Sequence, residues 1–164
     1  MAADRTLRRC QRGTTIAVPM TRAASSRRRR LAFHEAGHCV VAEALGLSIK
    51  SVELLDDESD GIMRLACAVA HLARVERIAI CVAGYIGGEA SGAPALTGEG
   101  EVDDREAYVI ALSADEHNAK PLVARGRLVA RSLLTERRKR LHAVATALAE
   151  RGLLNANDLA ALTE

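Results

Sequence analysis

The segment His34-Glu35-Ala36-Gly37-His38 brings together side chains that could bind and use a metal ion. One helical turn separates the two histidines, so in a helix both imidazoles project from the same face. Two nitrogens at this spacing can bind one zinc ion, and a glutamate beside them can take a proton from water. The H-E-x-x-H pattern therefore predicts His34 and His38 as metal ligands and Glu35 as the catalytic base of a zinc peptidase.

The residues around the motif predict that it lies inside a helix. Ser25-Ser26 can cap a helix that starts before the motif, and Gly46 suits its C-terminal end. Apolar residues recur near helical spacing at Leu31, Val41 and Leu45. Gly37 costs such a helix about 1 kcal/mol relative to alanine, a cost that the close approach of another backbone or of substrate would offset. The alternative is an ordinary core helix with two hydrogen-bonded histidines and a surface glutamate.

Two histidines do not complete a catalytic zinc site, which needs three protein ligands and an open position. Ala44 stands where the extended H-E-x-x-H-x-x-G-x-x-H pattern has its third histidine, so that class is excluded. Glu43 is predicted to point away from the ligand face. The remaining candidates lie farther along the chain: His71, Glu89, Asp103, Asp104 and His117. Chemistry favours either aspartate, because a flexible loop meets a helix start there; simple helix capping is the alternative role.

Composition predicts one mainly helical domain. The chain has 164 residues, of which 49% are hydrophobic, and its aromatic residues are only Phe33, Tyr85 and Tyr108. A core of alanine, leucine, valine and isoleucine favours packed helices. We expect residues 1–24 to form a basic, disordered arm and residues 25–164 to form the zinc peptidase domain.

The pattern of the chain predicts an α+β fold, a helical bundle with a small β-hairpin beside the H-E-x-x-H helix. The hairpin is expected from strands at 48–55 and 62–65. A loop is expected at 91–101 because of its proline and glycines. The expected helices that follow the hairpin are 66–82, 103–112, 120–134 and 136–151, and a short last helix that Asn157 caps.

Charge is unevenly distributed along the sequence. Residues 1–30 hold nine arginines and one acid, whereas the remainder holds 14 basic and 20 acidic residues. The run 27–30 is interpreted as a solvated helix start; contact with nucleic acid or acidic lipid is the alternative. Nucleic acid is not the expected partner, because no aromatic residues interleave with these arginines.

The cysteines and the apolar stretches predict a cytoplasmic protein without a membrane span. Cys39, Cys67 and Cys81 lie in apolar stretches and are expected to be small buried thiols, which fits a reducing compartment. No apolar leader segment opens the chain, and charged residues interrupt its longest apolar stretch.

Residues 31–42 resemble the A-Y-H-E-A-G-H-A-V-V segment of the FtsH-type zinc proteases. The likeness continues through 78–90 and into Thr97-Gly98 followed by Asp103, Ala107 and Ala111, which is similar to the family's T-G-x-x-x-D-L-x-x-A-x-x-x-A stretch. It covers roughly residues 27–163. The aspartate of the family's T-G-x-x-x-D-L pattern is its third zinc ligand, so the resemblance implies that Asp103, and not Asp104, is the third ligand here.

The resemblance also implies a zincin-like fold, a bound Zn²⁺ and polypeptide substrates. The sequence departs from the family because no G-x-x-x-x-G-K-[ST] motif is present, and Val102 stands where an asparagine is common. We therefore expect a stand-alone metalloendopeptidase that hydrolyses unfolded or flexible chains. A separate ATPase or unfoldase partner and a homo-oligomer both stay open. The alternative function is a catalytically silent binding or regulatory module with a peptidase-like fold.

Overall fold

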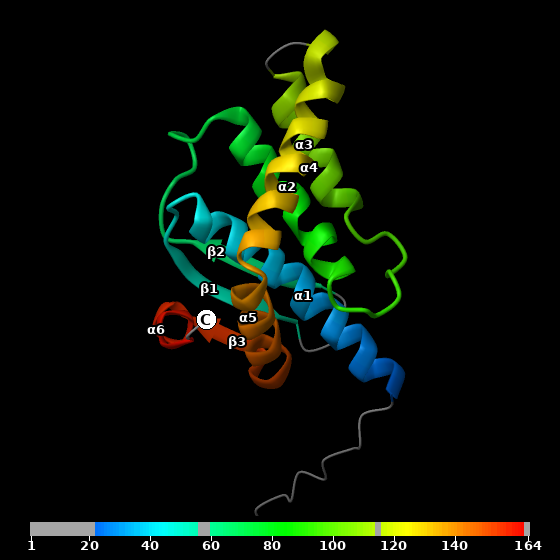
Figure 1. Cartoon of the computed structure of the whole chain (residues 1–164), viewed down its shortest axis with the longest axis vertical. Helices are drawn as coiled ribbons and strands as arrows, with labels where there is room; N and C mark the ends of the chain where they lie inside the picture. Colours follow the sequence, from blue (N-terminus) through cyan, green and yellow to red (C-terminus); the bar gives the residue numbers. More distant parts are fainter. Residues whose placement is uncertain (1–21, 56–59, 114–115, 163–164) are drawn as a thin grey trace, which may run out of the picture.

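The computed structural model describes residues 22–55, 60–113 and 116–162, which form a mainly helical fold with one small antiparallel sheet (Figure 1). In chain order the elements are α1 (Arg22–Ala44), β1 (Ile49–Leu54), β2 (Gly61–Leu65), α2 (Arg74–Glu89), α3 (Glu101–Leu112), the 3-10 turn η1 (Glu116–Asn118), α4 (Ala119–Glu136), α5 (Arg138–Arg151), β3 (Leu153–Asn155) and α6 (Ala156–Ala161). The expected α+β class with mostly helical content is confirmed. Residues 1–21, most of the expected basic arm, lie outside the described residues.

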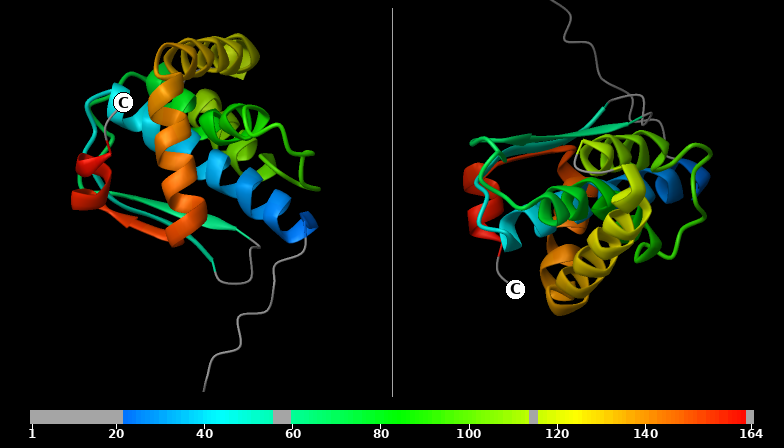
Figure 2. Two further views of the ribbon diagram at one scale, coloured as in Figure 1. Left: turned by 60° about the horizontal axis from the view of Figure 1, so that its bottom comes forward. Right: turned by 90° about the horizontal axis from the view of Figure 1, so that it is seen from above.

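Helix α1 is the central element and carries the H-E-x-x-H motif. It packs against α2, α5 and the strands β1 and β2. Its buried apolar residues lie on almost every side of the helix, as expected for an element that is covered all round: Leu31, Ala32, Phe33, Ala36, Cys39, Val40, Val41 and Ala42. Figure 2 shows the sheet along one side of the helices. The motif is therefore held in the most constrained part of the fold.

Glycines allow α1 and α2 to cross with their backbones in contact. A Cβ at Gly37 would collide with the carbonyl oxygen of Ala83, and one at Gly87 would collide with that of Phe33. The two helices make their closest approach here because neither residue has a side chain. This crossing explains why a glycine occupies the middle of the motif helix despite its cost in helix propensity.

The sheet has the strand order β2-β1-β3, with both pairings antiparallel. The expected hairpin is confirmed, with Val52 opposite Met63 and Leu54 opposite Gly61. The third strand, β3, was not expected from the sequence. It has only three residues, and it joins the sheet because buried Leu154 lies opposite Val52. β2 is left at one edge of the sheet.

The expected helix at 66–82 is wrong in its bounds. The helix begins at Arg74, where the Glu76 carboxylate accepts the backbone N–H of Ala73 at 2.8 Å, and it continues through three glycines to Glu89. Those glycines do not break it because they lie against other elements of the fold. Helix α1 begins at Arg22, so Ser25-Ser26 lies inside it and is not its cap.

The later helices and the cysteines differ less from expectation. Gly152, with φ of 78°, ends α5 as expected, but Asn155 and not Asn157 caps α6, by accepting the backbone N–H groups of residues 157 and 158. Cys39 is buried and Cys81 is partly buried, whereas Cys67 is exposed, so the expectation of three buried thiols fails for Cys67.

None of the described helices combines the length and the apolar character that a membrane crossing requires.

Candidate metal centre

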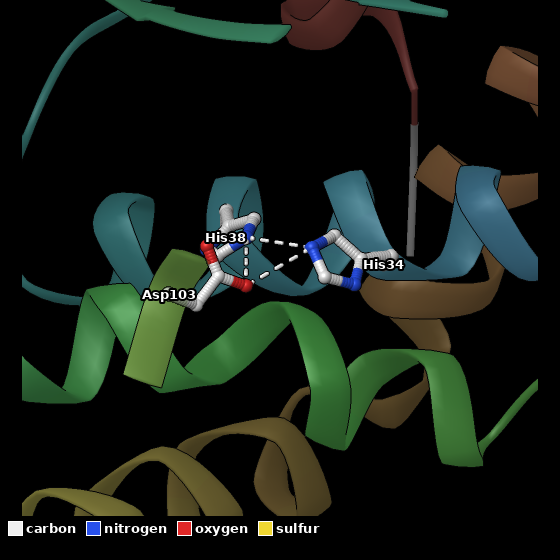
Figure 3. Close-up of side chains that lie close together, drawn as sticks. All are labelled: His34, His38 and Asp103. Atoms are coloured by element: carbon white, nitrogen blue, oxygen red, sulfur yellow. Dashed lines mark hydrogen bonds and ion pairs between the residues drawn. The ribbon is translucent and has the colours of Figure 1, made fainter. Parts of the chain in front are cut away.

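Three side chains from two elements converge on one point beside α1 (Figure 3). His34 and His38 project from the same face of the helix, and their Nε2 atoms lie 3.1 Å apart. Asp103, in the first turn of α3, brings Oδ2 to 3.1 Å from Nε2 of His34 and 3.4 Å from Nε2 of His38. A tetrahedral zinc ion with bonds of about 2.1 Å holds its ligand atoms roughly 3.4 Å apart, so the three atoms are spaced as such an ion requires.

The hydrogen bonds of these groups fit a metal ion as well. Oδ2 of Asp103 is buried and accepts no hydrogen bond of regular geometry; its neighbours are the Nε2 atoms of His34 and His38, the two other candidate ligand atoms. Nδ1 of His38 lies 2.7 Å from the carbonyl oxygen of Ile80, to which it can donate its proton. The lone pair of Nε2 is then free for a cation, which is the arrangement that metal-binding histidines adopt.

The charges of the three side chains depend on one another in the metal-free protein. Burial lowers the pKa of His38, but the adjacent Asp103 carboxylate outweighs it and raises that pKa to about 9. Burial likewise raises the pKa of Asp103, but His34 and His38 outweigh it and hold the pKa well below its usual range. A proton therefore occupies the position that a divalent cation would take.

The first turn of α3 directs Asp103, and not Asp104, toward α1. The helix begins directly after Gly100, which adopts φ of 79°. Successive helical residues are about 100° apart around the axis, so only one of the two aspartates can face α1. Asp104 turns away to the guanidinium of Arg127, with N–O distances of 2.8 and 2.9 Å.

The other candidates from the sequence are not brought to this point. His71 and His117 are exposed, and Glu89 lies 3.4 Å from Arg131 on the surface of α2 and α4. Glu43 points away from the ligand face as expected, because both of its oxygens accept hydrogen bonds from Arg140. Among the described residues, only His34, His38 and Asp103 form a group able to hold a metal ion.

Glu35 lies next to the three ligand candidates and is almost completely buried, with 4% of its surface exposed. A Cβ at Gly61, the first residue of β2, would collide with the Glu35 side chain and lie 2.8 Å from its Oε1. Burial raises the pKa of Glu35, while the charges of His38 and His34 oppose that rise. A carboxylate whose pKa is raised in this way is a stronger base than an exposed glutamate.

Gly84 of α2 forms the floor of the candidate centre and was not identified as a functional residue from the sequence. A Cβ there would collide with the Nε2 atoms of both His34 and His38. A glycine is required because any side chain would occupy the space between the two imidazoles and α2. From the sequence alone, the glycines of this segment allow either a helix break or a close helix contact.

A cavity of about 520 Å³ opens beside these groups. Its walls come from α1, α2, the start of β2, the loop 96–100 and the first turns of α3. Apolar residues and carboxylates share the lining, including Ile62, Met63, Leu96, Asp60 and Glu106. The size is within the range of small-molecule and peptide subsites, roughly 300–1,000 Å³.

No family model matches the chain, and no curated protein matches it. Membership of the FtsH-type family therefore stays a prediction from residues 31–42 and the stretch around Asp103.

Proposed function

We propose that this protein is a zinc-dependent metalloendopeptidase that hydrolyses peptide bonds in unfolded or flexible polypeptides. The observation that carries the proposal is the convergence of His34, His38 and Asp103 beside a buried Glu35 on one cavity wall. A structural zinc site has no need of such a base, because its ion is enclosed by four protein ligands. Three ligands with an adjacent acid–base group are typical of catalytic sites.

Each residue has a distinct role in this proposal. His34, His38 and Asp103 would hold the ion, with His38 oriented by the Ile80 carbonyl. When bound, zinc supplies Lewis acidity, which polarises the scissile carbonyl and lowers the pKa of the attacking water. Glu35 accepts the proton of that water and returns it to the nitrogen of the leaving amine.

The position of β2 suggests how an extended substrate would lie. β2 is at the edge of the sheet and pairs with β1 on one side, and residues 60–63 also line the cavity. An extended peptide can add to such an edge as a further antiparallel strand. Its backbone would then run past Gly61, the position at which a Cβ would collide with the Glu35 side chain. This geometry requires a flexible chain, which is why folded proteins are not the expected substrates.

Zinc affinity is expected to fall as the pH drops below 9. His38 carries a proton in the metal-free protein up to a pH near its pKa of about 9, and zinc must displace that proton. Between pH 7 and 8.5 the affinity should therefore rise by about tenfold per pH unit, with one proton released per ion bound. Calorimetry in buffers of different ionisation enthalpy, with a chelator fixing free zinc, measures both quantities. An affinity that does not change across this range would contradict the arrangement.

The proposed activity is tested with the full chain loaded with one equivalent of zinc. We expect hydrolysis of a reduced, alkylated protein that cannot refold, and no cleavage of the same protein in its native, disulfide-bonded form. A chelator should abolish the activity and added zinc should restore it. Stoichiometric zinc binding without cleavage of any unfolded chain would instead favour the binding or regulatory module. Degradation of the native substrate would contradict the expected requirement for a flexible chain.

A further inference from the structure

A further carboxylate, that of Glu99, lies beside the candidate centre, near the Nδ1 atom of His34. Glu99, in the loop before α3, has a side chain that is 4% exposed. Nε of Arg30 lies 2.9 Å from both of its oxygens, and the backbone N–H of Leu96 donates to Oε2 at 3.0 Å. Arg30 also donates to the carbonyl oxygen of Ala93 at 3.0 Å. The carboxylate is therefore fixed from several directions.

Anchoring of the loop does not by itself explain this arrangement. Burying two charges costs desolvation free energy that their attraction often fails to repay, so apolar residues would anchor a loop at least as well. The fold also makes room for the carboxylate: a Cβ at Gly88 of α2 would collide with Oε1 of Glu99. The Arg30–Glu99 ion pair is buried despite this desolvation cost, and Gly88 leaves space for Oε1 of Glu99. Both observations indicate that Oε1 has a further partner.

That partner is the outer nitrogen of His34. Nδ1 of His34 lies 3.5 Å from Oε1 of Glu99, and it is buried without a hydrogen-bond partner. A histidine that binds a metal through Nε2 must carry its proton on Nδ1, and a buried N–H needs an acceptor. His38 satisfies this requirement through the Ile80 carbonyl at 2.7 Å. Glu99 offers the corresponding acceptor for His34, a few tenths of an ångström beyond the usual limit of about 3.2 Å.

We propose that Glu99 is a positioning residue for the metal centre, which accepts the Nδ1 proton of His34 while Arg30 holds its carboxylate in place. This inference rests on the proposed metal centre and deepens it. Glu99 is not a fourth ligand, because its oxygen faces Nδ1 of His34 and not the point where the three ligand atoms converge. It connects His34 to the loop 96–100, which also forms part of the cavity wall.

The test compares Glu99→Gln with Glu101→Gln. Both changes remove one negative charge from the same segment, but Glu101 is exposed and belongs to no group that could hold the metal. Zinc affinity is measured by competition with a chromogenic chelator, and the Co²⁺-substituted protein is examined by visible absorption. We expect Glu99→Gln to weaken zinc binding by about 10–100-fold and to shift the Co²⁺ bands. Glu101→Gln should change neither.

Thermal unfolding of the metal-free variants separates positioning from loop anchoring. A purely structural role predicts that Glu99→Gln lowers the melting temperature but leaves zinc affinity and the Co²⁺ spectrum equal to those of Glu101→Gln, which would overturn the inference. If Glu99→Gln does not fold, Glu99→Asp keeps the charge opposite Arg30 but has a side chain shorter by one methylene. It should then show the weaker zinc binding, and an unchanged affinity would again overturn the inference.

These readouts also keep the inference separate from the proposed activity. A wild-type protein that binds zinc but cleaves no substrate would contradict the peptidase proposal. The zinc affinity of Glu99→Gln would still decide whether Glu99 positions His34. Conversely, an active wild-type enzyme whose Glu99→Gln variant binds zinc normally would contradict only the role of Glu99.

Discussion

Replacing Glu35 with glutamine is expected to abolish most hydrolysis while zinc stays bound. The substitution preserves the shape of a side chain that is almost completely buried and packed against Gly61. It removes the group that accepts a proton, and glutamine has no comparable basicity. Because a positioned general base typically contributes 10²–10⁴-fold to a rate, kcat should fall by about that factor. Zinc affinity should change little, because Glu35 is outside the group of three ligands.

The matched control for this variant is Glu101→Gln. Glu101 is exposed, is not among the residues that line the cavity, and is assigned no part in the proposed reaction. Its substitution makes the same change in charge and should leave kcat within about twofold. Steady-state cleavage of an unfolded substrate, with metal content measured on the same samples, gives both numbers. A Glu35→Gln enzyme that keeps more than a tenth of the wild-type kcat would remove Glu35 from its role as base.

The part of the site within one helix could be predicted from the sequence, because helical spacing alone sets it. His34 and His38 share a face at any position of a regular helix, and Glu35 is carried beside them. The fold class followed in the same way from composition and from the turn signals around the hairpin. These features depend on residues that are near one another in the chain.

The parts that depend on distant residues could not be predicted in this way. Asp103 and Asp104 are equivalent in chemistry, and the choice between them came from the family resemblance, since which of them faces α1 depends on how α3 packs in the folded chain. Gly84 and Glu99 carry no motif; their importance arises from what packs against them. Similarly, β3 has three residues and gains its place only through the pairing with β1.

The glycines of α2 show why local signals were misleading there. Glycine is a poor helix former, so the expected helix stopped at residue 82, and the glycines at 84–88 allowed either a break or a close helix contact. In the structure each of these glycines lies against a functional or structural neighbour: Gly84 against the two imidazoles, Gly87 against α1 and Gly88 against Glu99. The cost in helix propensity is offset by contacts that only the folded chain reveals.

The choice between the aspartates leads to the largest expected effect on metal binding. Asp103→Ala removes the one carboxylate that reaches both histidine nitrogens, at 3.1 and 3.4 Å. Two imidazoles bind zinc more weakly than three ligands do. Removing a residue that only hydrogen-bonds to a ligand typically weakens metal binding by roughly 10–100-fold, and the loss of the ligand Asp103 should weaken zinc binding by more than that. Hydrolysis at micromolar zinc should be lost with it.

Asp104→Ala provides the matched comparison, because it removes the same group from the next residue of the same helix. Its loss breaks only a half-exposed ion pair with Arg127, worth about 0–1 kcal/mol. Zinc should raise the melting temperature of the wild type and of Asp104→Ala alike, since a ligand that binds only the folded state stabilises it. It should leave that of Asp103→Ala unchanged. Because each variant is compared with its own metal-free form, any intrinsic loss of stability cancels. Equal zinc-induced stabilisation of the two variants would mean that α3 contributes no ligand to the centre.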